Sequence, residues 1–456
     1  MDRTRIVTWI AALVALVAPW PAHGQVGDDP CGKNHYILGG LHDFKAECAP
    51  VPVDDRGELL GKATEIDIGL PTAVVADDFG NLFVSSQHIV YKVDAAGLLW
   101  RVAGNGAPGY GGDGGLARDA RLDTPIGVDR RLLPPDTAFL SSGLALDGRG
   151  NLFVADTLNN RVRRIGAGGV ITTVAGDGTF NGFDDGSDDV DGTPATSLPM
   201  SWPIGVAASP SGTLYVSLAS GPVKRVLADG SSHTASVSTC SGSDRDDGTC
   251  SPGQLAIDAE DQALIPDNRC RVRRSGDPTG PAYMAFAGPA TTIVGRTDIV
   301  SSDSTWWDSF IDAHCTAPLD GPSRSAHLSG RPNAVALGAD GSLYIADSFF
   351  HCVRKLDATG NLTTVEAAGP CRGASGGDVA CLARAGENGF APKGGDASCT
   401  ARRQGSAPTL SLPLGVSVDR LGNLYIADTL NSRVVKLEPG RAIVTIAGTV
   451  RVGTAP

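Results

Sequence analysis

The sequence predicts an all-β fold built from small four-stranded antiparallel sheets, and three observations support this prediction. The 456-residue chain contains 59 glycines and 29 prolines, and no long stretch spaces its apolar residues as a helix would. One sequence pattern recurs along the chain. Its clearest copy, residues 143–176, holds four short β-rich runs separated by turn residues. Such a sheet cannot bury both faces alone, so six copies are expected to stack into a six-bladed β-propeller.

The repeat is recognised by runs of the type GNLFVADT, which follow a turn and precede a second β-rich run. Three copies are clear and three are looser, and the copy that begins at Gln254 is the most degenerate. In chain order the copies span residues 72–104, 143–176, 204–237, 254–294, 333–365 and 414–448. In the clearest copy the four expected strands are Leu144–Leu146, Leu152–Ala155, Val162–Ile165 and Ile171–Val174.

The N-terminus has the pattern of a secretory signal peptide over residues 1–24. Arg3 and Arg5 precede the apolar run 6–18, and small residues suit cleavage before Gln25. A membrane anchor is the alternative, although the run is short for a bilayer span. The following residues 25–61 are predicted to form a disulfide-closed segment, which either caps the propeller or adds a strand to it. The propeller is predicted over residues 62–449, with a C-terminal tail at 450–456.

Ten cysteines and the absence of any C-x-x-C favour disulfides over zinc in an exported chain. We expect three pairs from proximity along the chain or within a blade: Cys31–Cys48, Cys240–Cys250 and Cys270–Cys315. Cys352 would pair with Cys371, Cys381 or Cys399. Buried free thiols are the alternative for some of them. The location implied is secreted or periplasmic.

The net charge of −12 argues against two classes of partner. An acidic surface repels phosphate backbones and anionic lipid headgroups. Nucleic acid is therefore not expected as a partner, and no segment after the signal peptide is apolar enough to insert into a membrane.

The segments GNLFVADTLNNRV (150–162) and GNLYIADTLNSRV (422–434) resemble the NHL-repeat family. The glycine-rich run 109–115 resembles a linker of its bacterial extracellular members, and the likeness covers about residues 62–449. The resemblance implies the propeller fold and says little about function. Peptide-amidating lyases with this repeat bind zinc through histidines where the inner strands begin, and lactonase-like propellers hold calcium there through Glu, Asn and Asp. The matching positions here are Thr72, Ile204, Asn333 and Leu414, so the zinc-binding histidines are absent, and only Asn333 offers a calcium ligand.

The alternating strand directions predict which loops share a face. With strands a to d numbered from the axis outwards, the b–c turns and the connections from strand d to the next strand a lie on one face. The long connections, about 105–142, 177–203, 238–253, 295–332 and 366–413, would all decorate that face, where binding is expected. The candidate ligand-binding residues there are Asn159, Asn160, Trp306, Trp307, His351 and Asn431.

Two further patterns have both a structural and a functional interpretation. Asp156 and Arg161 recur as Asp428 and Arg433, which favours an ion pair that fixes each b–c turn over a substrate site. Cys352 stands where the arginine is expected in the fifth copy, as if a disulfide replaced the pair.

An acidic insert and a tryptophan pair are the other candidates. The alternating oxygen ligands Asp185, Ser187, Asp189 and Asp191 suit either a calcium site or a solvated loop. Trp306 and Trp307 either stack on a sugar or a protein partner, or pack their insert onto the blades.

Three function classes follow from these patterns. A binding module for an extracellular protein or glycan needs only loops on a rigid frame. A propeller enzyme of lyase or lactonase type needs converging ligands on the axis, and no catalytic constellation or certain cofactor is evident; calcium is the candidate metal. A structural envelope protein is the third class.

Overall fold

The structure is a computed structural model. It describes residues 57–124, 141–181, 190–219, 223–236, 252–267, 271–275, 291–294, 320–323, 326, 328, 332–365 and 410–449. The chain divides into the units Met1–Cys48 and Ala49–Pro456, and every described residue lies in the second. The predicted signal peptide, most of the segment 25–61 and the tail 450–456 therefore lie outside the described residues. Within the described ranges no helix is long and apolar enough to cross a membrane.

The strands form six antiparallel sheets of four or five strands each, which confirms the predicted all-β fold. Each sheet is one blade. The inner to outer strands of blades 1 to 3 are β2 (Pro71–Ala76), β3 (Leu82–Ser86), β4 (Ile89–Val93) and β5 (Leu98–Ala103); β6 (Leu144–Leu146), β7 (Leu152–Asp156), β8 (Arg161–Ile165) and β9 (Ile171–Ala175); and β11 (Pro203–Ala208), β12 (Leu214–Leu218), β13 (Val223–Val226) and β14 (Ser231–Ser236).

Blades 4 to 6 follow the same order. They consist of β15 (Ala256–Ile257), β16 (Ala263–Asp267), β17 (Arg271–Arg274) and β18 (Thr291–Val294); β20 (Pro332–Leu337), β21 (Leu343–Asp347), β22 (Cys352–Leu356) and β23 (Asn361–Thr364); and β24 (Pro413–Val418), β25 (Leu424–Asp428), β26 (Arg433–Leu437) and β27 (Val444–Ala447). Short 3₁₀ turns lie between them at η2 (Ala63–Glu65), η3 (Ala117–Asp119), η5 (Thr157–Asn159), η6 (Ala167–Gly169), η7 (Ala195–Ser197), η10 (Ser348–Phe350) and η13 (Thr429–Asn431).

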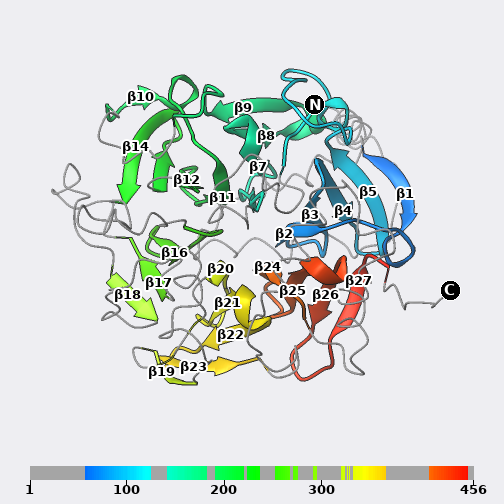
Figure 1. The fold of residues 1–456 in the computed structure, drawn as a ribbon, viewed down its shortest axis with the longest axis vertical. Coiled ribbons are helices and arrows are strands. Elements are labelled where there is room, and N and C mark those ends of the chain that lie inside the picture. The colour runs from blue at the N-terminus through cyan, green and yellow to red at the C-terminus, as the bar shows by residue number, and fades with distance from the viewer. Residues whose placement is uncertain are drawn as a thin grey trace, which may run out of the picture. The chain divides into compact units, whose positions relative to one another are not determined.

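The six sheets are arranged in a ring (Figure 1). Inner strands of successive blades contact one another, and β24 of the last blade contacts β2 of the first. One backbone hydrogen bond recurs between blades. A glycine after strand d donates its N–H to an alanine carbonyl in the segment that leads to the next blade of the ring, and the last blade is joined to the first in this way. These bonds join Gly104 to Ala117, Gly176 to Ala195 and Gly448 to Ala63, each at 2.9 Å.

Three blades carry a fifth, outermost strand. It comes from the segment that precedes the blade: β1 (Glu58–Lys62) pairs with β5, β10 (Thr193–Pro194) with β14, and β19 (Gly321–Pro322) with β23. Four of the five residues of β1, Glu58–Gly61, belong to the segment 25–61, so the end of that segment adds a strand to blade 1, and its residues 25–56 lie outside the described residues.

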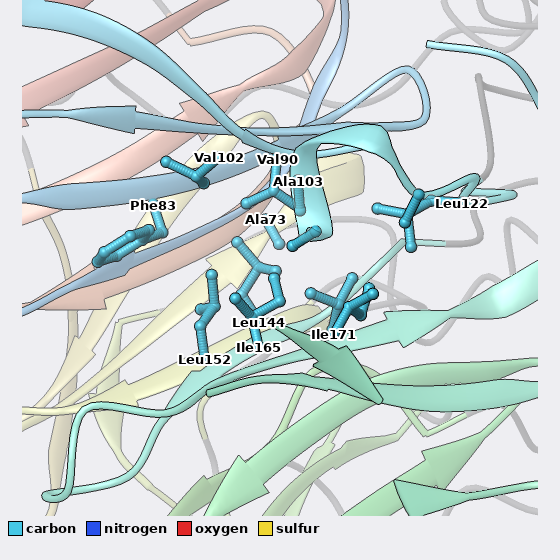
Figure 2. Packing of buried hydrophobic residues seen from close by; sticks show 13 residues of the cluster. Ala73, Phe83, Val90, Val102, Ala103, Leu122, Leu144, Leu152, Ile165 and Ile171 are labelled. Atoms are coloured by element: carbon cyan, nitrogen blue, oxygen red, sulfur yellow. The ribbon is translucent and has the colours of Figure 1, made fainter. Parts of the chain in front are cut away.

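The core lies between neighbouring blades, because each small sheet buries its faces only against the next. Figure 2 shows this packing for blades 1 and 2, where Phe83 and Val90 of one blade meet Leu144 and Leu152 of the next. The backbones approach closely near the axis: a Cβ added to Gly143 would lie 2.7 Å from the Cα of Gly205. Only glycine fits such a contact without displacing the neighbouring strand.

Candidate functional site

The b–c turns and the connections between blades share one face, which we call the connection face. Leu158 N–H, in turn η5, donates to the carbonyl of Asp123 at 2.9 Å. The Asn159 side-chain amide donates to the carbonyl of Gly109 at 2.9 Å. These bonds confirm the predicted arrangement for the described parts of the first connection.

One residue in several b–c turns adopts a left-handed conformation and holds the connection to the next blade. His88, Asn160 and His351 have φ between 53° and 64°. Each accepts a backbone N–H of the connection to the next blade, through the side-chain atom Nδ1 or Oδ1. For Asn160 and His351 the donor directly precedes the next inner strand. The bonds are His88 Nδ1 with Thr124 N–H (3.1 Å), Asn160 Oδ1 with Trp202 N–H (3.0 Å) and His351 Nδ1 with Leu412 N–H (2.9 Å). We call these three side chains latch residues.

A buried carboxylate holds the neighbouring N–H of the same connection. Asp156 Oδ1 accepts the N–H of Asp123 at 2.7 Å, and Asp428 Oδ1 accepts the N–H of Ser411 at 2.7 Å. Two consecutive N–H groups are therefore bound from two different blades, the first by the carboxylate of the blade ahead and the second by the latch residue of the blade behind. This arrangement ties the connection to both blades.

The arginine partner of that carboxylate differs from the expected one in two blades. Asp428 pairs with Arg433 as predicted, at 2.8 Å. Asp156 instead pairs with the fully buried Arg163 at 3.0 Å, whereas Arg161 donates to the carbonyls of Asn159 and Asp177. The prediction for Arg161 was wrong because positions 161 and 163 lie on the same side of β8, and the residue at 163 enters the core.

The fifth blade retains its ion pair although Cys352 replaces the expected arginine. Arg354 Nη1 lies 3.6 Å from Asp347 Oδ2, and both side chains are fully buried. Arg354 corresponds to Arg163, since each lies two residues further along strand c. The idea that a disulfide replaces the pair is therefore corrected. Cys352 itself is fully buried in β22.

Three aspartates of the connections have equivalent places at the outer edges of their blades. Each accepts the backbone N–H of a threonine in strand d: Asp113 from Thr173 (3.0 Å), Asp191 from Thr234 (3.3 Å) and Asp320 from Thr364 (3.2 Å). Asp113 and Asp320 also pair with Arg163 and Arg354. Asp191, which was considered above as a calcium ligand, thus makes the same contact with strand d as Asp113 and Asp320. Its carboxylate also lies 3.5 Å from His233.

The candidate residues of the connection face that are described belong to this frame. Asn159 and Asn431 donate to the carboxylates of Asp156 and Asp428, and Asn160 and His351 are latch residues. Asn159, Asn160 and His351 are buried, and Asn431 is half-buried. The remaining candidates, Trp306, Trp307, Asp185, Ser187, Asp189 and every cysteine except Cys352, lie outside the described residues.

The axis is crossed by a side chain that the sequence did not single out. Gln254, on the inner edge of blade 4, donates from Nε2 to the carbonyl of Thr72 in the opposite blade at 2.9 Å. Asn333 next to it is 4% exposed, and its Nδ2 has no hydrogen-bond partner. Among the described residues no three His, Cys, Asp or Glu side chains gather as a metal site would require.

Two exposed aromatic rings lie on the connection face of blades 2 and 3. Tyr110 is 44% exposed and Phe180 is 47% exposed. Phe180 stacks on Trp202, with ring centroids 4.3 Å apart, and the guanidinium of Arg161 lies 3.9 Å from the centre of the Tyr110 ring. We call Tyr110, Arg161, Phe180 and Trp202 the aromatic platform. The sequence did not predict the platform because its four residues lie far apart in the chain, unlike the adjacent Trp306 and Trp307.

His88 makes one latch sensitive to pH. Burial lowers its pKa to about 4, so the ring is neutral and Nδ1 is free to accept the Thr124 N–H. Burial, together with the nearby Asp156 carboxylate, raises the pKa of the adjacent Asp123 to about 6. The two groups lie 3.5 Å apart. Their protonation has opposite effects on stability.

His88→Asn should remove a loss of stability in acid. An unfolded histidine binds a proton below about pH 6.5, whereas folded His88 does so only near pH 4, so its contribution falls as the pH drops between these values, by up to about 3 kcal/mol. Asparagine does not titrate and already acts as the latch in blade 2. Urea denaturation should therefore give similar stability for both proteins at pH 7.5 and a more stable variant at pH 4.5. A wild type that stays the more stable at pH 4.5 would contradict this role of His88.

Comparison with known proteins supports the fold. Residues 410–437 match the NHL repeat family. Among solved structures, a protein of unknown function from Bacteroides thetaiotaomicron is 16% identical, with a TM-score of 0.50 over 82% of this chain and 71% of that one. This likeness shows the fold alone.

Two other similar structures have lower scores and carry no argument about function. Virginiamycin B lyase from Staphylococcus aureus is 11% identical with a TM-score of 0.41, over 88% of this chain and 90% of that one. An auxiliary nutrient binding protein from B. thetaiotaomicron is 13% identical with a TM-score of 0.45, over 84% and 70%. A search of curated proteins found no match.

Proposed function

We propose that this chain, a six-bladed β-propeller built from NHL repeats, is an exported binding module for an extracellular protein or glycan. The ligand would bind the connection face. The observation that carries the proposal is the contrast on that face between a fixed frame and exposed rings. The latch residues and buried carboxylates hold the backbone, whereas Tyr110 and Phe180 remain open to solvent. Exposed aromatic side chains on a rigid support are typical of binding sites.

The location of the protein is part of the same proposal. The N-terminal segment 1–24 supports export as a secretory signal, and the ten cysteines support an oxidising compartment. We propose that buried Cys352 is disulfide-bonded to a cysteine of the connection 366–413, such as Cys399, and that Cys31–Cys48, Cys240–Cys250 and Cys270–Cys315 close other loops.

The axis supports this proposal over an axial enzyme site. An enzyme of that kind needs room and reactive groups where the inner strands begin. Here Gln254 spans the axis to Thr72 and both side chains are buried. The Gln254 side chain thus joins opposite blades across the axis.

A pair of bulky substitutions tests which face binds. Asn181→Arg places a long side chain beside the platform. Leu421→Arg places the same side chain in the a–b turn of blade 6, on the opposite face. Binding to immobilised secreted proteins and glycans should fall at least about tenfold for Asn181→Arg and stay unchanged for Leu421→Arg. A protein whose binding depends on Leu421 and not on Asn181 would refute the assignment of the face.

A further inference from the structure

We infer that the aromatic platform binds a neutral polysaccharide. This inference rests on the proposed function and names its ligand class. The platform joins three segments that are distant in sequence: the first connection, strand β8 and the second connection. Its rings provide flat apolar surfaces of the size of a single sugar ring. The inference depends on how those rings are supported, on what surrounds them and on the charge of the chain.

Phe180 is supported from one side only. Trp202 stacks on it with an angle of 29° between the rings, and Trp202 itself packs on the buried Ile204 and Ala219. The backbone N–H of Trp202 is held by Asn160. A ring that is ordered before binding loses little conformational entropy when a ligand stacks on its open side, and this increases the affinity.

Tyr110 is supported by two arginine side chains. The guanidinium groups of Arg161 and Arg163 lie 3.9 and 4.9 Å from the centre of its ring. Arg161 also donates to the carbonyl of Asp177 at 2.5 Å, in the turn that leads to Phe180. Arg161 therefore links the two rings into one surface.

The surroundings of the rings are polar. Thr179 and Asn181 are exposed on either side of Phe180 in the chain, and the Tyr110 hydroxyl donates to Asp113 Oδ2 at 3.1 Å. A protein interface has its aromatic residues in an apolar core of several hundred square ångströms, whereas the described residues on either side of Phe180, Thr179 and Asn181, are polar and exposed. A sugar has apolar C–H faces for the rings and hydroxyls for the amide and hydroxyl groups around them. The chemistry of the platform therefore favours a glycan over a protein.

The charge of the chain selects among glycans. With a net charge of −12, the protein repels uronic acids and sulfated sugars. The positive groups that contact the Tyr110 ring are already used within the chain, since Arg161 and Arg163 donate to carbonyls and carboxylates. A neutral polysaccharide encounters neither this repulsion nor a need for further cations.

Native affinity electrophoresis tests the inference with soluble mannan, xylan and β-glucan, and with polygalacturonate as the anionic comparison. At least one neutral polysaccharide should retard the wild-type protein. Phe180→Ala and Tyr110→Ala should each raise its dissociation constant about tenfold or more. Phe180→Tyr keeps the ring and should bind normally. Leu421→Ala removes an 81% exposed apolar side chain from the opposite face and should also bind normally.

The other outcomes separate the inference from the proposed function. Retention of binding in Phe180→Ala and Tyr110→Ala overturns the platform. Binding of polygalacturonate alone overturns the neutral ligand. A secreted protein that binds through the connection face, with no retardation by any neutral polysaccharide, overturns the glycan and leaves the proposed function in place. Absence of both kinds of binding overturns both. Since Phe180 and Tyr110 are about half exposed, their replacement should lower the urea denaturation midpoint only slightly, and a cooperative transition excludes misfolding.

Discussion

Arg163→Met should lower the free energy of unfolding by about 3 to 5 kcal/mol, the usual result of removing one partner from a buried ion pair. Arg163 is fully buried and binds Asp156 at 3.0 Å and Asp113 at 2.6 Å. Methionine fills a similar volume but leaves the Asp156 carboxylate buried without its cation. Urea denaturation at pH 7.5 measures the change.

Two comparison variants show whether the buried charge is the cause. Arg164→Met removes the adjacent, exposed arginine of the same strand and should change stability by less than about 0.5 kcal/mol. Asp156→Asn combined with Arg163→Met removes both charges and should recover part of the loss. Equal losses for Arg163→Met and Arg164→Met would show that Arg163 is not a buried anchor of the blade.

Gly176→Ala should destabilise the protein by more than about 2 kcal/mol, or prevent folding. Gly176 has φ = 87°, and an added Cβ would lie 2.1 Å from the carbonyl oxygen of the latch residue Asn160. Both atoms belong to backbone that is fixed by hydrogen bonds, so neither can move at low cost. Urea denaturation, or the soluble yield if the variant does not fold, measures the effect.

Gly168→Ala is the matched control in the same blade. Gly168 has φ = 78°, but a Cβ there would meet no atom within 4 Å. Its replacement should cost only the conformational penalty, about 1 kcal/mol. Equal effects at the two glycines would mean that the close contact with the latch residue is absent. Gly104 and Gly448 make the same approach to His88 and Ser432 and should behave as Gly176 does.

The strands could be predicted because the same pattern recurs in six copies along the chain. Runs such as Leu152–Asp156 and Leu424–Asp428 are short, nearly continuous apolar stretches between two turns. A chain that repeats this unit six times can bury its apolar residues by closing a ring. The fifth strands could not be predicted in the same way. β10 and β19 have two residues each, too few to form a recognisable apolar run, and they exist because a neighbouring strand d offers its open edge.

The details of the connection face were harder to predict because they depend on contacts between distant residues. Asn160 and His351 were expected to face a ligand, and they accept backbone N–H groups of the next connection instead. His88 was not predicted as an equivalent of Asn160. The b–c turn of blade 1 is two residues shorter than that of blade 2, so the two residues do not align in the sequence. The feature that these residues share, a positive φ directly before strand c without being glycine, is visible only in the structure.

Hydrogen–deuterium exchange of the unliganded protein tests the central claim most directly, that the latch residues and buried carboxylates fix the connections to the ring. The account predicts that the amides of Asp123, Thr124, Trp202, Ser411 and Leu412 exchange as slowly as those of the neighbouring inner strands, although they lie in loops. Exchange of these amides at the rate of exposed loop residues would contradict it.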